Sequence, residues 1–196
     1  RSSPSFVAGI GLNALGSGDA TVQAAIVQAM STGLVHLSNL YRTAPAAVLA
    51  QMLVDASFAA SVFFCNSGAE ANEAAFKFVR RWARTRGGDA KHEVVALRNS
   101  FHGRLFGALA ATDRPAMQAP FTPLMPGVRF VDPYDAASFD GAIDPARTAA
   151  IIAEPVQGEG GVHPLPADVL ARMLSLAADG TLWADLKVSL YRILVA

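Results

Sequence analysis

The sequence lacks most features that would mark a secreted, membrane-bound or nucleic-acid-binding protein. A single cysteine, Cys65, excludes an internal disulfide framework. No run approaches the ~20 apolar residues of a membrane span, and residues 1–5 lack the apolar stretch of a signal peptide. Sixteen basic residues balance sixteen acidic ones, which leaves no broad attraction to nucleic acid or anionic membrane. We therefore expect a cytoplasmic protein whose partners are small molecules or other protein chains.

Lysine is scarce as well. It occurs only at Lys77, Lys91 and Lys187, and the other basic residues are arginines, which cannot supply an amine for covalent chemistry. The histidines lack the spacing of metal ligands, so we expect no metal site. With 52% hydrophobic residues over 196 positions, the chain is long and apolar enough to bury one substantial core.

The stretch from 62 to 73 predicts a short buried strand at 62–65, a loop of small residues and the start of a helix. An apolar stripe recurs with helical spacing and is predicted to face inward: Ala71, Ala74, Ala75, Phe78, Val79 and Trp82. Ser67, followed three positions later by Glu70, matches a capping box, in which the serine oxygen accepts a backbone N–H and the glutamate reaches back to the cap. The helix is therefore predicted to begin near Ser67.

Two small residues, Gly68 and Ala69, follow the predicted cap. They leave the first-turn N–H groups accessible, and these groups, with the positive end of the helix dipole, favour a phosphate or carboxylate. The alternative is an ordinary capped helix after a core strand, since capping boxes are common. Cys65 lies in the apolar strand, so we interpret it as a small buried hydrophobe rather than a nucleophile.

Helical and strand patterns alternate along the chain. They predict helices at 22–30, 45–56, 71–82, 105–111, 136–143 and 167–178, and further strands at 93–97, 128–131 and 148–153. The last helix is predicted to face inward with Val169, Leu170, Met173, Leu174 and Ala177. Prolines between 115 and 126 predict an irregular segment. The alternation predicts an α/β fold with a mainly parallel sheet flanked by helices.

Three polar loops, around Asn66, Asn99 and Glu154, each follow a predicted strand. Because ligands of such sheets bind beyond the carboxyl ends of the strands, we expect the loops to meet there. A glycine-rich segment at 9–14 fits a dinucleotide-binding fingerprint, but no helix opens directly at it and no acidic residue lies about 20 positions further on. We interpret that segment as a turn and reject a nicotinamide site.

The three loops resemble, residue by residue, those of the class III (fold type I) aminotransferases, which use pyridoxal 5'-phosphate, and most closely the acetylornithine aminotransferases. The resemblance runs from about residue 6 to residue 180 and is most specific in four blocks, at 38–41, 63–73, 101–104 and 154–162. It implies that Ser67, Gly68 and Ala69 bind the cofactor phosphate, with Gly68 and Ala69 donating backbone N–H groups.

The same resemblance implies roles for five further residues. Phe101 would stack on the pyridine ring, His102 would lie beside the cofactor, and Arg104 would bind a substrate carboxylate. Glu154 would be the catalytic carboxylate near the ring, while Glu159 would pair with an arginine and move aside for the second carboxylate of the substrate. From the residues alone, the alternatives are a core aromatic, a solvated surface arginine and two solvated loop carboxylates.

Beyond residue 180 the chain departs from the family pattern. The Schiff-base lysine, and the aspartate that keeps the pyridine nitrogen protonated, are expected there. Asp185 is a weak match to the aspartate, and Lys187 has no matching motif. We therefore expect a truncated aminotransferase with three parts: an N-terminal segment (1–44), a partial cofactor-binding large domain (45–180) and a divergent tail (181–196).

The resemblance implies that the intact enzyme is a homodimer and that it acts in arginine biosynthesis. It would move an amino group from N-acetylornithine, or a related ω-amino donor, to the 2-oxo acid 2-oxoglutarate. Ornithine and 4-aminobutyrate aminotransferases are the alternative relatives. A non-catalytic fragment that binds phosphate or cofactor, or only interacts with a partner chain, is the alternative from another class, and the missing lysine favours it.

Overall fold

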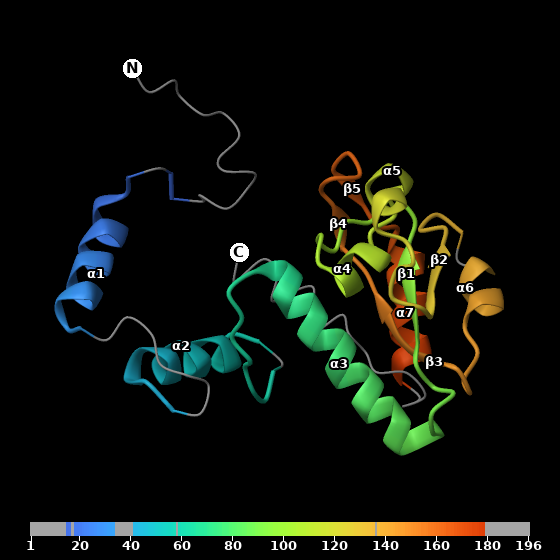
Figure 1. Ribbon diagram of the computed structural model, residues 1–196, viewed down its shortest axis with the longest axis horizontal. Helices are drawn as coiled ribbons and strands as arrows, with labels where there is room; N and C mark the ends of the chain where they lie inside the picture. The colour runs from blue at the N-terminus through green and yellow to red at the C-terminus, as the bar shows by residue number, and fades with distance from the viewer. Residues whose placement is uncertain (1–14, 17, 34–40, 58, 136, 179–196) are drawn as a thin grey trace. The chain divides into compact units, whose positions relative to one another are not determined.

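The structure is a computed structural model, and it describes residues 15–16, 18–33, 41–57, 59–135 and 137–178. The chain divides into two compact units, Arg1–Phe63 and Phe64–Ala196 (Figure 1). The three-part division with boundaries at 44 and 180 remains a prediction. The glycine-rich segment 9–14, most of the block 38–41, and Asp185 and Lys187 lie outside the described residues.

The described part of the first unit contains two helices, and each begins at a residue whose side chain caps it. Helix α1 (Ala20–Ser31) starts at Asp19, whose Oδ1 accepts the Val22 N–H at 2.9 Å. Helix α2 (Ala44–Asp55) starts at Thr43, with proline in its first turn. Both predicted helices are confirmed. Their apolar stripes are not buried, because α1 has no buried residue and α2 has only Leu53.

The second unit is built on a parallel three-stranded sheet in the order β2-β1-β3. The strands are β1 (Glu93–Leu97), β2 (Val128–Val131) and β3 (Thr148–Ile152). In the register of the sheet, Val95 lies opposite Arg129 of β2 and Ile151 of β3. Every residue of β1 is buried, as expected for a central strand covered on both faces. The predicted α/β fold and these three strands are confirmed.

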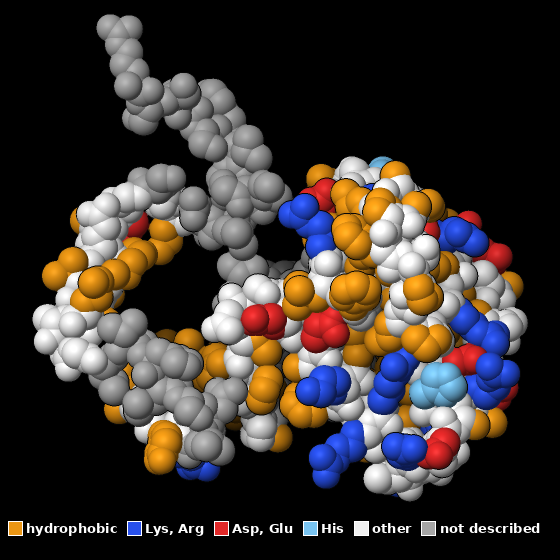
Figure 2. Space-filling view, viewed as in Figure 1, with side chains coloured by type: hydrophobic (Ala, Val, Ile, Leu, Met, Phe, Trp, Pro, Cys, Tyr) orange, Lys and Arg blue, Asp and Glu red, His pale blue; other side chains and the backbone are white. Residues whose placement is uncertain are grey.

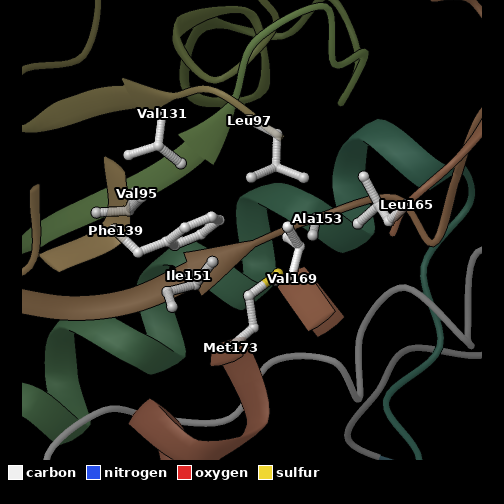
Figure 3. Close-up of a cluster of buried hydrophobic side chains, with 9 residues drawn as sticks. All are labelled: Val95, Leu97, Val131, Phe139, Ile151, Ala153, Leu165, Val169 and Met173. Atoms are coloured by element: carbon white, nitrogen blue, oxygen red, sulfur yellow. The ribbon is translucent and has the colours of Figure 1, made fainter. Parts of the chain in front are cut away.

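Successive residues of β1 face opposite helical layers. One layer packs α6 (Ala137–Ala142) and α7 (Ala167–Ala178) against the sheet. Its core, drawn in Figure 3, consists of Val95, Leu97, Val131, Phe139, Ile151, Ala153, Leu165, Val169 and Met173. On the other face, Val94 and Ala96 pack with Phe76 of α3 (Gly68–Gly87). The sheet therefore lies between two helical layers.

The strand predicted at 62–65 is wrong. No strand forms there in the described part of the chain, and the Phe63 side chain is 54% exposed. A strand needs a hydrogen-bonding neighbour, and an apolar run does not supply one by itself. Cys65 is half-buried rather than buried in a core strand. The loop and the capped helix start near Ser67 that were predicted from the same stretch are confirmed.

The buried side of α3 differs from the predicted stripe. Its buried residues are Asn72, Ala75, Phe76, Val79 and Ala83. Phe78, which the apolar pattern placed inward, is 44% exposed. Similarly, Leu174 of α7 is 48% exposed, whereas Val169 and Met173 are buried as predicted. The helices are where the periodicity puts them, but the packing partners decide which side is covered.

The remaining elements are short. They are α4 (Phe106–Ala110), α5 (Pro115–Gln118), the 3-10 helix η1 (Ala119–Phe121) and the antiparallel pair β4 (Val156–Gln157) and β5 (His163–Pro164). The segment predicted to be irregular thus contains α5 and η1, because proline is well suited to a first helical turn, where its missing N–H costs nothing. None of the helices in the described ranges is long and apolar enough to cross a membrane.

Candidate functional site

The N-terminus of α3 leaves two backbone donors available. Ser67 Oγ accepts the Glu70 N–H at 3.2 Å, and Ser67 O accepts the Ala71 N–H at 3.0 Å. Glu70 Oε2 accepts the N–H of Asn66 at 2.7 Å, one residue before the cap that the sequence pattern indicated. No described residue accepts the N–H of Gly68 or Ala69. Both residues are half-buried, and their first-turn amides are available to an acceptor from outside the helix.

The loop that follows β1 packs directly on this helix start. Gly103 has φ +120°, and a Cβ at this position would lie 2.7 Å from Ala69 Cβ, so a side chain there would collide with the first turn of α3. Asn72, 3% exposed, donates from Nδ2 to His102 O at 2.6 Å. The segment 101–104 is therefore held against the N-terminus of α3.

A buried threonine, Thr112, also holds the same loop. Thr112 Oγ1 accepts the His102 N–H at 2.8 Å and lies 3.0 Å from both Gly103 O and Ala108 O, either of which can accept its proton. At the start of the loop, Asp113 Oδ2 accepts the Asn99 N–H at 2.8 Å. The backbone from 99 to 103 is thus anchored by hydrogen bonds.

The third polar loop completes the arrangement. Glu154, 8% exposed, accepts the Phe101 N–H at 2.8 Å through Oε2. Gln157 Nε2 donates to Arg98 O at 2.8 Å, and Arg114 Nη2 donates to Glu159 O at 3.0 Å. The three polar loops therefore meet beyond the carboxyl ends of β1 and β3, and we call this region the carboxyl edge.

The predicted site residues differ in how open they are. Arg104 and Glu159 have exposed side chains, and Phe101 is half-buried. His102 is only 2% exposed, with its backbone N–H and C=O bound to Thr112 and Asn72. Oε2 of Glu154 is already engaged by the Phe101 N–H, so this carboxylate supports the loop in addition to any role toward a ligand. The individual roles remain predictions.

Sequence reasoning missed the polar residues that support the loops. Asn72, Glu73, Thr112 and Gln157 each hold a backbone group of a neighbouring segment. Asn72 and Glu73 follow the capping box after one intervening residue, Ala71. The available signal was a pair of polar residues in the first turns of a helix whose other faces carry alanine and phenylalanine. That signal does not identify their partners, which lie 30 or more residues away.

The thiol and amine groups of the described residues lie in different places. Burial raises the pKa of the half-buried Cys65 thiol, and the negative charge of Glu70 adds to this effect. Lys77 is exposed on α3, about 13 Å along the helix from Gly68. Lys91 precedes β1, at the opposite end of the sheet from the loops, and its Nζ donates to Pro145 O. No three metal-ligating side chains cluster within the described ranges.

Comparison with known families identifies this arrangement. The family model described as aminotransferase class III matches residues 5–182. The chain belongs to the class III aminotransferases. It is 44% identical over 174 residues to an acetylornithine aminotransferase of Methanocaldococcus jannaschii, covering 89% of this chain and 43% of that protein. It is 45% identical over 159 residues to a succinylornithine transaminase of Salmonella typhimurium, covering 81% of this chain and 38% of that protein.

Solved structures show the same fold. An ornithine aminotransferase from Toxoplasma gondii superposes with a TM-score of 0.82 at 26% identity, covering 90% of this chain and 42% of that one. This class III aminotransferase sequence therefore spans about two fifths of the length of the relatives that it matches. Pyridoxal phosphate is the cofactor of the family.

Proposed function

We propose that the carboxyl edge of this chain binds pyridoxal phosphate, with the phosphate at the N-terminus of α3. The donor set fits a phosphate, because the Gly68 and Ala69 amides lack an acceptor among the described residues and Ser67 Oγ, while accepting one hydrogen bond, retains its proton to donate. The positive end of the 20-residue helix adds to the attraction.

Phe101, Glu154 and Arg104 would serve the rest of the site. The Phe101 backbone is fixed by Glu154, which presets the ring for stacking on a flat heterocycle. The exposed Arg104 guanidinium can grip a substrate carboxylate with two parallel hydrogen bonds. When bound, pyridoxal phosphate supplies the electron-withdrawing ring that lets an amino group pass between an amino acid and a 2-oxo acid.

For the whole protein, we propose amino transfer from N-acetylornithine, or a related ω-amino donor, to 2-oxoglutarate. The acetylornithine and succinylornithine relatives support this donor class. Arg104 supports carboxylate recognition, and Glu159 is proposed to yield to the second carboxylate of the 2-oxo acid. Ornithine and 4-aminobutyrate remain alternative donors. A homodimer in the cytoplasm, serving arginine biosynthesis, is part of the same proposal.

The observation that carries the proposal is the contact of the 101–104 loop with a helix start whose amides are available. We test it by titrating the chain with pyridoxal phosphate and with pyridoxal, which has no phosphate. A Gly68→Asp substitution places a negative charge where the phosphate would lie, in a position that suits a helix start. We expect at least a tenfold loss of pyridoxal phosphate affinity and little change for pyridoxal.

The matched control is Gly141→Asp on α6, where a new Cβ meets no atom within 4 Å. It introduces the same charge away from the loops and should leave both affinities unchanged. Equal binding of pyridoxal phosphate by the wild type and the Gly68→Asp variant would refute the phosphate site.

A second candidate, cofactor binding without turnover by this chain, is favoured by the positions of Lys77 and Lys91. Both lie away from the carboxyl edge, so neither can reach a cofactor held at Gly68. We expect no glutamate formation from 2-oxoglutarate and N-acetylornithine. Borohydride reduction followed by mass spectrometry should find no stoichiometrically modified lysine. Labelling of Lys187 together with turnover would instead favour amino transfer by this chain itself.

A further inference from the structure

Two consecutive residues of α3 hold the segment that carries Arg104. Asn72 Nδ2 donates to His102 O at 2.6 Å, two residues before Arg104. Glu73 Oε1 accepts the Ala108 N–H at 2.8 Å, four residues after it. Arg104 itself is exposed between these anchors. The helix that offers the phosphate-binding amides therefore also fixes where the predicted carboxylate-binding arginine lies.

Glu73 supplies the hydrogen-bond acceptor that the N-cap residue of α4 lacks. The N-cap residue Leu105 makes no side-chain hydrogen bond, since an apolar side chain cannot accept one. Ala108 is the third residue of α4, and its N–H is one that a capping side chain would ordinarily accept. Ala108 is fully buried, so loss of the acceptor would leave its N–H without water as a replacement.

Gly107 leaves the space that this carboxylate occupies. A Cβ at Gly107 would lie 2.7 Å from Glu73 Oε2 and 3.0 Å from Oε1, closer than atoms normally pack. The φ of Gly107 is not in the left-handed region, so its backbone conformation does not require glycine. A methyl group at position 107 would instead have to displace the Glu73 carboxylate from its present place.

We propose that Glu73 is a positioning residue: its carboxylate fixes the start of α4, and through it Arg104 and Phe101, over the N-terminus of α3. The choice of ligand rests on the proposed function, whereas the anchoring rests on the contacts alone. A ligand that uses only the α3 amides should bind independently of Glu73. A ligand that also reaches the 101–104 loop should depend on it.

The test compares inorganic phosphate with pyridoxal phosphate on the full chain. In Glu73→Ala, we expect pyridoxal phosphate to bind about tenfold more weakly and phosphate affinity to change by less than about twofold. Glu73→Gln keeps an oxygen that can accept the Ala108 N–H, so we expect pyridoxal phosphate affinity within about threefold of wild type. Lys77→Ala, one turn further along α3 and exposed, is the control and should change neither affinity.

Hydrogen exchange over residues 101–110 supplies a readout that needs no ligand. We expect about tenfold faster exchange there in Glu73→Ala, a much smaller change in Glu73→Gln, and none in Lys77→Ala. Gly107→Ala should also speed exchange, because its methyl group displaces the carboxylate. In the Glu73→Ala background, Gly107→Ala should have no further effect, since the two residues act through one contact.

Two results would overturn the proposal. Equal weakening of phosphate and pyridoxal phosphate in Glu73→Ala would show that Glu73 only supports the fold. Unchanged exchange over 101–110 would show that it does not anchor the loop. If the wild-type chain binds no pyridoxal phosphate, the proposed function fails, and the exchange data still decide whether Glu73 positions Arg104.

Discussion

The two ends of the same parallel sheet use their polar groups in opposite ways. At the amino edge, where β1 begins, Glu93 is 3% exposed and forms ion pairs with Arg129, at 2.9 Å, and with Arg147. Arg80 donates to His92 O and Pro126 O, and burial lowers its pKa. Figure 2 shows basic side chains gathered, with acidic ones among them, over the lower part of the second unit, where α3 ends.

At the carboxyl edge, the buried polar groups bind backbone instead. Glu154, Thr112 and Asn72 each hold a main-chain group of the 101–103 segment. This leaves Arg104 and the first-turn amides of α3 for an external partner. The amino edge therefore pairs its charges internally and so stabilises the sheet, whereas the carboxyl edge fixes its backbone and keeps donors for a ligand.

The largest expected effect is at the amino edge. Glu93→Ala leaves Arg129 and Arg147 without their shared carboxylate. Because both arginines remain partly solvated, we expect a loss of about 3 kcal/mol in unfolding free energy, the lower end for a broken buried pair. Urea denaturation measures it. Asp89→Ala, which breaks the exposed pair with Arg84, is the control and should leave the unfolding free energy almost unchanged, because water screens that pair. A similar small loss for Glu93→Ala would contradict this account.

Two buried threonines, one at each edge, should have effects of intermediate size. Thr112→Val removes the acceptor of the His102 N–H at the carboxyl edge, and Thr148→Val removes the acceptor of the Asp144 N–H at the amino edge. Both hydroxyls are fully buried, so each change should cost about 2 kcal/mol of unfolding free energy. Only Thr112→Val should also weaken pyridoxal phosphate binding by the folded protein. Equal effects on binding would erase the distinction between the two edges.

The cap of α3 should have a smaller effect on stability. Ser67→Ala removes the acceptor of the Glu70 N–H, which should cost about 1 kcal/mol in thermal or urea unfolding. It should weaken phosphate binding too, because the hydroxyl donor is lost. Ser67→Asp restores the cap but places a negative charge beside the phosphate position. We expect recovered stability with binding still weak, and recovered binding would argue against a phosphate at this helix start.

The smallest effect concerns the Cys65 thiol. Its pKa lies above the ordinary value because of burial and, second, the charge of Glu70. The rate of iodoacetamide alkylation should therefore rise with pH later than that of a free cysteine peptide. As pH rises through the ordinary thiol pKa, the unfolded chain loses its proton first, so stability should fall slightly. An alkylation midpoint at or below that of the peptide would contradict this direction.

Much of the fold was accessible from local pattern. The periodicity of α3 and α7, and the apolar runs of β1, β2 and β3, predicted their elements to within a few residues. The false strand at 62–65 had the same composition as a true one. A strand exists only when another strand lies beside it, and composition does not report that neighbour.

The helix start and the loops of the candidate site were predictable from the sequence, but the polar side chains that anchor the loops were not. The capping box and the small residues after it predicted the helix start at Ser67, and the polar residues after each predicted strand indicated the loops. The anchors Asn72, Glu73 and Thr112 were missed. The residue type alone does not reveal whether an amide, a carboxylate or a hydroxyl binds water or a distant backbone group. Their partners are set by how α3, α4 and the loop after β1 pack together.

Local sequence patterns were enough to predict α3, α4, α6 and α7, the three strands of the parallel sheet, and the beginning of α3 with its small residues. Hydrophobic period, capping and side-chain volume act over a few residues, so they can be recognised without knowing the fold. Only the tertiary structure decided which side of α3 is buried, that Gly103 lies against Ala69, and that Glu73 caps α4. These contacts join residues about 30 positions apart. They depend on how α3 and the segment after β1 pack against each other, which no local pattern encodes.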